Sequence, residues 1–222
     1  MVAPPGEANR VHIKWLEWLE VLKNEVLALH HHRNLWKAMT DALELESEAE
    51  TFRAHYTRCY ADAAASAIRR LADGSTDRNS ISLRRVIADI RANPSVMTRD
   101  RYVSLFDEPG VIDPIRKRAP KEFDEHWGDS GGRIRPDLLD ALDKTVAADT
   151  KRVAGWVDRT VAHIDKRGVS DPPTFADLDA AIDSVGNVLR KLLLLLTAEN
   201  WIAMTPTPQD DWRAPFRKPL FG

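Results

Sequence analysis

The stretch VHIKWLEWLEVLKNEVLAL, residues 11–29, decides the fold class. Its apolar residues recur every three or four positions, which is the period of one face of an α-helix. They are Val11, Trp15, Trp18, Leu19, Leu22, Val26 and Leu29. The same period returns along most of the chain, and no segment shows the alternation of a half-buried strand. The sequence therefore predicts an all-α helical bundle of about five to seven helices.

Further segments carry this helical period, with prolines and glycines between them. They are about 47–72, about 80–93, 98–106, 136 to about 167, and 175 to about 200. Residues 107–134 hold three prolines and four glycines, so we expect a long irregular loop there.

The C-terminal residues 201–222 combine four prolines with Trp212, Phe216 and Phe221. Proline forbids a regular helix, and the aromatic rings favour packing, so we expect an extended tail that lies on the bundle. A chain of 222 residues fits one helical domain, with a core at about 10–200 and the tail after it.

Composition excludes several classes of protein. The 32 Lys and Arg residues against 34 Asp and Glu give a net charge of −2, so any nucleic-acid contact must come from a local patch. Cys59 is the single cysteine, which excludes an internal disulfide framework. The glycines form no phosphate-binding loop motif, and the longest apolar run, Leu192–Leu196, is too short to span a membrane. We expect a cytoplasmic protein with no membrane association and no cofactor.

Chemistry is concentrated in RVAGWVDRTVAHIDKR, residues 152–167. On a helix, Arg159 and His163 lie four residues apart and share a face. Arginine binds a phosphate through its two-pronged guanidinium and offsets the charge that builds up during phosphoryl transfer. Histidine titrates near neutral pH and can exchange a proton with a ribose 2′-hydroxyl or a leaving 5′-oxygen. This pair suits attack on a phosphodiester without a metal ion.

Two blocks of the sequence resemble the AbiU-like abortive-infection proteins of the HEPN superfamily. The first is residues 157–165, with the Ala-His-x-Asp signature that ends at Asp165. The second is residues 67–73 followed by 80–90, in which an arginine- and aspartate-bearing helix end precedes a helix led by Ser82 and Leu83. The blocks stand in the expected order, and the similarity extends loosely over residues 30–170.

This resemblance implies a helical bundle that forms a homodimer. It implies a metal-independent endoribonuclease acting in phage defence or as a toxin, with RNA as substrate and an antitoxin or other protein as partner. The roles it suggests are acid and base for His163, phosphate anchor for Arg159, and orientation of both for Asp158 or Asp165. Candidate RNA-binding residues are Arg69, Arg70, Arg116, Lys117 and Arg118.

The spacing of the motif leaves an alternative open. Family ribonucleases place four to six residues between arginine and histidine, whereas three separate Arg159 from His163. The alternative is a catalytically degraded module of the same fold that binds RNA, a nucleotide or a protein without cleavage. A purely structural helical dimer is a third hypothesis. Likewise, Arg69, Arg70 and Asp73 are either a phosphate-binding corner or an ion pair that fixes a helix end.

Two other features have weaker interpretations. His30, His31 and His32 are consecutive, so on a helix they point in different directions and do not predict a metal site. The run Leu192–Leu196 is apolar all round its helix, which makes it the best candidate for a subunit interface.

Overall fold

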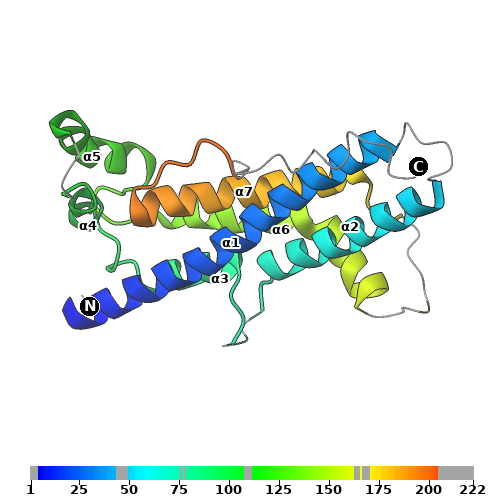
Figure 1. Ribbon diagram of the computed structural model, residues 1–222. Coiled ribbons are helices and arrows are strands. Elements are labelled where there is room, and N and C mark those ends of the chain that lie inside the picture. The colour runs from blue at the N-terminus through cyan, green and yellow to red at the C-terminus, as the bar shows by residue number, and fades with distance from the viewer. Residues whose placement is uncertain are drawn as a thin grey trace.

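The computed structural model describes residues 5–43, 50–75, 77, 79–107, 112–162, 166 and 171–204. Every regular element among them is helical, which confirms the predicted all-α bundle. The elements are α1 (Pro5–Leu43), α2 (Glu50–Leu71), α3 (Leu83–Ala92), α4 (Arg99–Ser104), α5 (Asp113–His126), α6 (Pro136–Trp156), the π-helical turn η1 (Val157–Val161) and α7 (Phe175–Thr197). Figure 1 shows that the long helices lie side by side.

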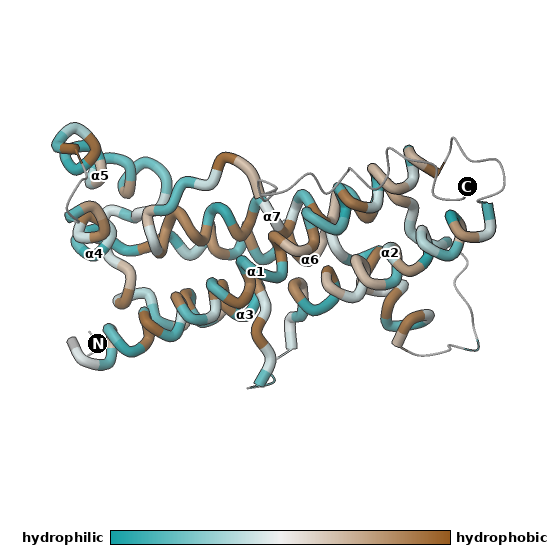
Figure 2. Tube along the Cα trace, in the orientation of Figure 1, coloured by the Kyte–Doolittle hydropathy of each residue, from teal (hydrophilic) through white to brown (hydrophobic). Residues whose placement is uncertain are grey.

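Helix α7 is the centre of the bundle. It begins with a capping box in which Thr174 and Asp177 exchange hydrogen bonds. The helices α1, α2 and α6 all pack against it (Figure 1), and hydrophobic residues recur along its whole length (Figure 2). Its buried residues are Leu178, Ala181, Ile182, Ser184, Val185, Gly186, Val188, Leu189, Leu192, Leu193, Leu195 and Leu196.

This position corrects the interface prediction for Leu192–Leu196. Leu192, Leu193, Leu195 and Leu196 are all at most 2% exposed within a single chain, so they form no exposed apolar surface. Helices of the same chain cover these four leucines, and only Leu194 of the run is partly exposed.

Helix α1 continues through the three consecutive histidines without a break. Only His30 of the three is buried, and its Nδ1 accepts a hydrogen bond from Nη2 of Arg33 at 3.1 Å. The ring lies against α7 at Gly186, where a Cβ atom would come within 2.7 Å of Nε2 of His30. Helices α1 and α7 therefore pack closely at His30, where glycine leaves room for the ring.

The predicted irregular loop over 107–134 is wrong in its middle, where α5 forms. Pro114 stands in the first turn of this helix, where its missing N–H costs no hydrogen bond. Pro120 lies inside the helix and removes one backbone hydrogen bond. Burial of Ala119 and Phe123 against α4 offsets this loss, and the Phe123 ring lies 5.5 Å from that of Tyr102.

Two other predicted boundaries need comment. The helix expected to run from Pro136 to about Arg167 is α-helical only to Trp156, and the π-helical turn η1 follows. Of the predicted C-terminal tail, Trp201 packs on the core and Met204 is buried. Trp212, Phe216 and Phe221 lie outside the described residues.

Replacing Gly186 with alanine should lower the free energy of unfolding by about 1–2 kcal/mol, because the new Cβ overpacks the buried ring of His30. Gly155→Ala in α6 is the matched control, since a Cβ there meets only Nη2 of Arg159 at an ordinary 3.6 Å. The control should be neutral or stabilising by up to about 1 kcal/mol. Urea unfolding measures both variants, and equal effects would contradict the close approach at Gly186.

The stability of the fold should also fall in mild acid. Burial and the neighbouring Arg33 guanidinium lower the pKa of His30 from 6.5 to about 4. The neutral ring therefore stabilises the fold above the unfolded pKa of about 6.5, and this contribution is lost as the pH falls toward 4. The variant His30→Gln cannot titrate, so the stability difference between wild type and variant should narrow over this pH range. A difference that stays constant would show that His30 is not the titrating group.

Candidate functional site

The candidate site lies where α6 ends and becomes the π-helical turn η1. Here the backbone N–H of Ala162 bonds to the carbonyl of Val157, five residues back. The Nε of Arg159 donates to the carbonyl of Gly155 at 2.9 Å, and the hydroxyl of Thr160 donates to the carbonyl of Trp156. Side chains thus take carbonyls that would otherwise serve the α-helical pattern, and this favours the wider turn. Such π-helical turns are frequent at functional sites.

Arg69 joins the two blocks of sequence that carry the family resemblance. From the last turn of α2 its Nε donates to Asp158 in η1 at 2.8 Å, and its Nη1 donates to Asp73 at 3.1 Å. The hydrogen bond to Asp158 raises the pKa of Arg69. Partial burial opposes ionisation of Asp73, but hydrogen bonds from Ser75 and Arg69 lower the pKa of its carboxyl below the usual value. We call Arg69, Asp73 and Asp158 the corner triad.

Asp158 and Arg159 are both exposed on the π-helical turn, whereas His163 and Asp165 lie outside the described residues. Of the other sequence-predicted residues, Arg70 turns away from the corner triad and pairs with Glu25 of α1 at 2.9 Å.

The structure does not bring the basic run Arg116–Arg118 to the corner triad. It lies on α5, at the opposite end of the bundle from the end of α6 (Figure 1). There the Nε of Arg116 donates to the carbonyl of Phe106 at 2.7 Å. An RNA strand held at the corner triad meets this run only if it extends along the bundle.

Sequence reasoning missed Arg152, which fastens the chain beyond the π-helical turn. From α6 it donates to Asp171 at 2.6 Å, to the carbonyl of Pro172 at 3.1 Å and to Asp177 at 2.8 Å. One arginine therefore ties the end of α6 to the start of α7. The sequence signal was available, since Asp171 and Asp177 flank a Pro-Pro-Thr helix start.

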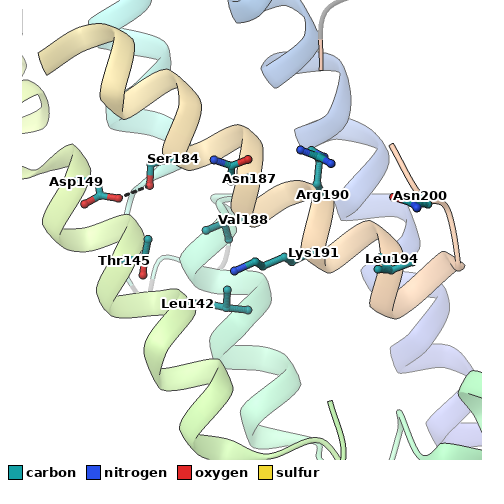
Figure 3. A pocket seen from close by; sticks show the side chains of 10 residues that line it. All are labelled: Leu142, Thr145, Asp149, Ser184, Asn187, Val188, Arg190, Lys191, Leu194 and Asn200. Atoms are coloured by element: carbon teal, nitrogen blue, oxygen red, sulfur yellow. Dashed lines mark hydrogen bonds between the residues drawn. The ribbon is translucent and has the colours of Figure 1, made fainter. Parts of the chain in front are cut away.

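The described surface near α6 includes an apolar and a polar pocket. A small apolar pocket of about 120 Å³ beside the π-helical turn is walled by Trp156, Pro172, Pro173 and Phe175, among others. A larger polar one of about 400 Å³ lies between α6 and α7 (Figure 3). Its carboxylate, Asp149, accepts a hydrogen bond from Ser184 at 2.7 Å, and no imidazole lines it.

A metal site and a membrane-spanning helix are both absent from the residues that the structure describes. No group of three or more His, Cys, Asp or Glu side chains there is arranged to hold a metal ion. Among the same residues, no helix combines the length and hydrophobicity needed to cross a bilayer.

Comparison with protein families identifies the relationship that the two blocks indicate. A family model described as AbiU2, of the HEPN type, matches residues 13–214. The chain belongs to the AbiU2 family of HEPN proteins. It is therefore an HEPN module of an abortive-infection family. No curated protein and no solved structure matches the chain.

The ion pair between Arg69 and Asp158 should be measurable by a double-mutant cycle. Their side chains are 36% and 54% exposed, so water screens the attraction. We expect a coupling free energy of about 0.2–1 kcal/mol between Arg69→Ala and Asp158→Ala, decreasing as salt is added. Thermal or urea unfolding of the wild type, both single variants and the double variant gives the value. Zero coupling at low salt would show that the two helix ends are not joined in solution.

Proposed function

We propose that this AbiU2-family chain is a metal-independent endoribonuclease that acts in phage defence or as a toxin, with its site at the π-helical turn. The observation that carries the proposal is the position of Arg159. Its side chain is exposed, and only its Nε has a hydrogen-bond partner among the described residues. Its two Nη groups are therefore available to a phosphate, which arginine binds through two parallel hydrogen bonds.

The proposed chemistry uses the 2′-hydroxyl of the RNA as nucleophile. The 2′-oxygen attacks phosphorus and the bond from phosphorus to the 5′-oxygen breaks. His163 takes the proton from the 2′-hydroxyl or gives one to the leaving 5′-oxygen, and Arg159 offsets the charge on the phosphoryl oxygens. Asp158 acts through position, because its ion pair with Arg69 fixes the π-helical turn that presents Arg159. Asp165 is proposed to orient His163.

The assembly proposed with this activity is a symmetric homodimer. In HEPN ribonucleases, motifs from two chains form one composite site, so one His163 can serve as base and the other as acid. The buried Leu192–Leu196 run does not supply the interface. An antitoxin or another protein partner belongs to the same proposal.

A binding module without cleavage is the second candidate, and two observations favour it. Only three residues separate Arg159 from His163, and the carboxylate of Asp158 is already engaged by Arg69. Such a module would hold RNA, a nucleotide or a protein at the same corner without acid and base catalysis.

The test is cleavage of labelled RNA in excess EDTA by wild type, His163→Ala and Arg159→Lys. His163→Ala should abolish cleavage and leave RNA affinity nearly unchanged, because an acid or base acts mainly in the transition state, typically by about 10²–10⁴-fold. Arg159→Lys should reduce cleavage, since lysine keeps the charge but loses the two-pronged geometry. Products should carry 2′,3′-cyclic phosphate ends, and DNA should remain intact.

Circular dichroism and light scattering of the same samples provide the controls, since both variants should keep the helical content and the dimer. Cleavage that persists in His163→Ala, or that requires Mg²⁺, contradicts the proposed mechanism. Wild type that binds RNA and never cleaves it supports the binding module instead. A monomer at micromolar concentration contradicts the composite site.

A further inference from the structure

A second cationic feature lies on the outer face of α3, next to the corner triad. A groove of about 400 Å³ runs along this helix and across to α6. The small residues Gly74, Ala88 and Ala92 are part of its lining. Three arginines line it, Arg84, Arg85 and Arg91, against two aspartates, Asp89 and Asp143, so one positive charge is in excess.

Four of these charged residues are engaged in ion pairs. Arg84 donates to both oxygens of Asp143 on α6, at 2.8 and 3.2 Å. Arg91 pairs with Asp140 at 2.7 Å. Asp89 pairs with Lys14 of α1 at 2.7 Å and accepts a hydrogen bond from the indole of Trp15 at 2.5 Å.

Arg85 is the exception, because no carboxylate meets it within the described part of the chain. Its guanidinium lies over the ring of Trp18, 5.3 Å from the centroid. Its Nη1 is shielded from solvent and has no hydrogen-bond partner among the described residues. An unsatisfied donor on a buried guanidinium is costly and calls for a partner. Asp89, one helical turn further on, is already held by Lys14.

The groove begins where the corner triad ends. Ser75 lines the groove, and it donates hydrogen bonds to Asp73 from its backbone N–H at 3.2 Å and from its hydroxyl at 2.7 Å. Gly74, between them, lies against Arg84, since a Cβ there would come within 2.4 Å of Nη1 of Arg84. Ser75 therefore connects the corner triad to the groove on α3.

We propose that the α3 groove binds the phosphodiester backbone of the RNA, with Arg85 as the principal phosphate ligand. The guanidinium swings from the face of Trp18 to a phosphate oxygen, which supplies the partner that Nη1 lacks. Arg84 and Arg91, held by carboxylates of α6, form the two ends of the groove. The choice of RNA as ligand rests on the proposed function. The groove adds the direction in which the RNA extends, from the π-helical turn toward α3.

The experiment measures binding of a 2′-O-methyl RNA oligonucleotide, which lacks the nucleophile and so remains uncleaved. Arg85→Met removes the charge and keeps an apolar stem over Trp18. It should weaken binding about 3- to 10-fold and reduce the slope of log affinity against log salt by about 0.7, the contribution of one phosphate contact on a single strand. Arg58→Met is the control, because Arg58 on α2 is exposed and lies outside the groove. Arg58→Met should change RNA affinity by less than about 2-fold, because salt screens the attraction between this exposed arginine and the RNA.

A second pair of variants avoids any effect on packing at Trp18. Ala88 is exposed in the lining of the groove, so Ala88→Glu places a carboxylate there without burying it. It should weaken RNA binding at least as much as Arg85→Met. Ala180→Glu, at an exposed position of α7 outside the groove, is its control and should bind normally.

Three outcomes separate the alternatives. If RNA affinity is unchanged in both Arg85→Met and Ala88→Glu, the proposal that the groove binds RNA is wrong. If millimolar inorganic phosphate raises the melting temperature of wild type but not of Arg85→Met, while both bind RNA equally, the ligand is a free anion and the RNA assignment is wrong. If Arg85→Met weakens RNA binding but the wild-type protein never cleaves RNA, the proposed groove is supported. The proposed ribonuclease function is then contradicted.

Discussion

Helix α7 carries apolar side chains around most of its circumference, and a single stripe that includes Ala180, Asp183, Asn187 and Lys191 is exposed. One neighbouring helix cannot cover so wide an apolar surface. Burial of one large aliphatic side chain stabilises a fold by about 1.5–3 kcal/mol, so leaving this surface exposed would be costly. Three helices, α1, α2 and α6, therefore surround it. Gly186 permits a close contact with α1, because the ring of His30 occupies the space that a side chain would fill.

The enclosure of α7 also determines where polar chemistry can gather. Because α2 and α6 flank the same helix, the end of α2 comes beside the turn that follows α6, and Arg69 reaches Asp158. The segment that leads into α7 is held there as well, by Arg152 at Asp171 and Asp177. Arg69 thus ties the π-helical turn to α2, and Arg152 ties α6 to the start of α7. The geometry of Arg159 follows from helix packing and ion pairs together.

The helical fold was predictable because its signal is repeated: the apolar period recurs in every long helix, and errors at single positions do not change it. Helix α5 was not predictable in this way. Pro114 and Pro120 are signals against a helix, and the segment buries only two residues, Ala119 and Phe123, that could indicate one. Helix α5 is stabilised by its contacts with α4, and helix propensities within the segment do not reveal such tertiary contacts. The Leu192–Leu196 run shows the converse error, because a sequence cannot distinguish an all-round apolar helix at a subunit interface from one at the centre of a bundle.

The sequence supplies candidate residues for the site, but it does not supply their geometry. Arg159 and Asp158 were identified from chemistry and resemblance, whereas the π-helical turn depends on which carbonyls the side chains of Arg159 and Thr160 reach. Pairing between Arg69 and Asp158 spans 89 residues, and no periodicity within either helix predicts it.

Net charge says little about whether a protein of this kind can hold a polyanion. Arg69, Arg70, Arg84, Arg91 and Arg152 each meet a carboxylate, so their charges contribute to the position of helices more than to the field outside them. Arg159 and Arg85 differ, since neither meets a carboxylate among the described residues, and each keeps guanidinium donors without a partner. A phosphate replaces no existing ion pair at either position, and at Arg85 it replaces only the contact with the ring of Trp18. A chain with a net charge of −2 can therefore contact successive phosphates of a single strand, provided that cations without an ion-pair partner, such as Arg159 and Arg85, lie along one path.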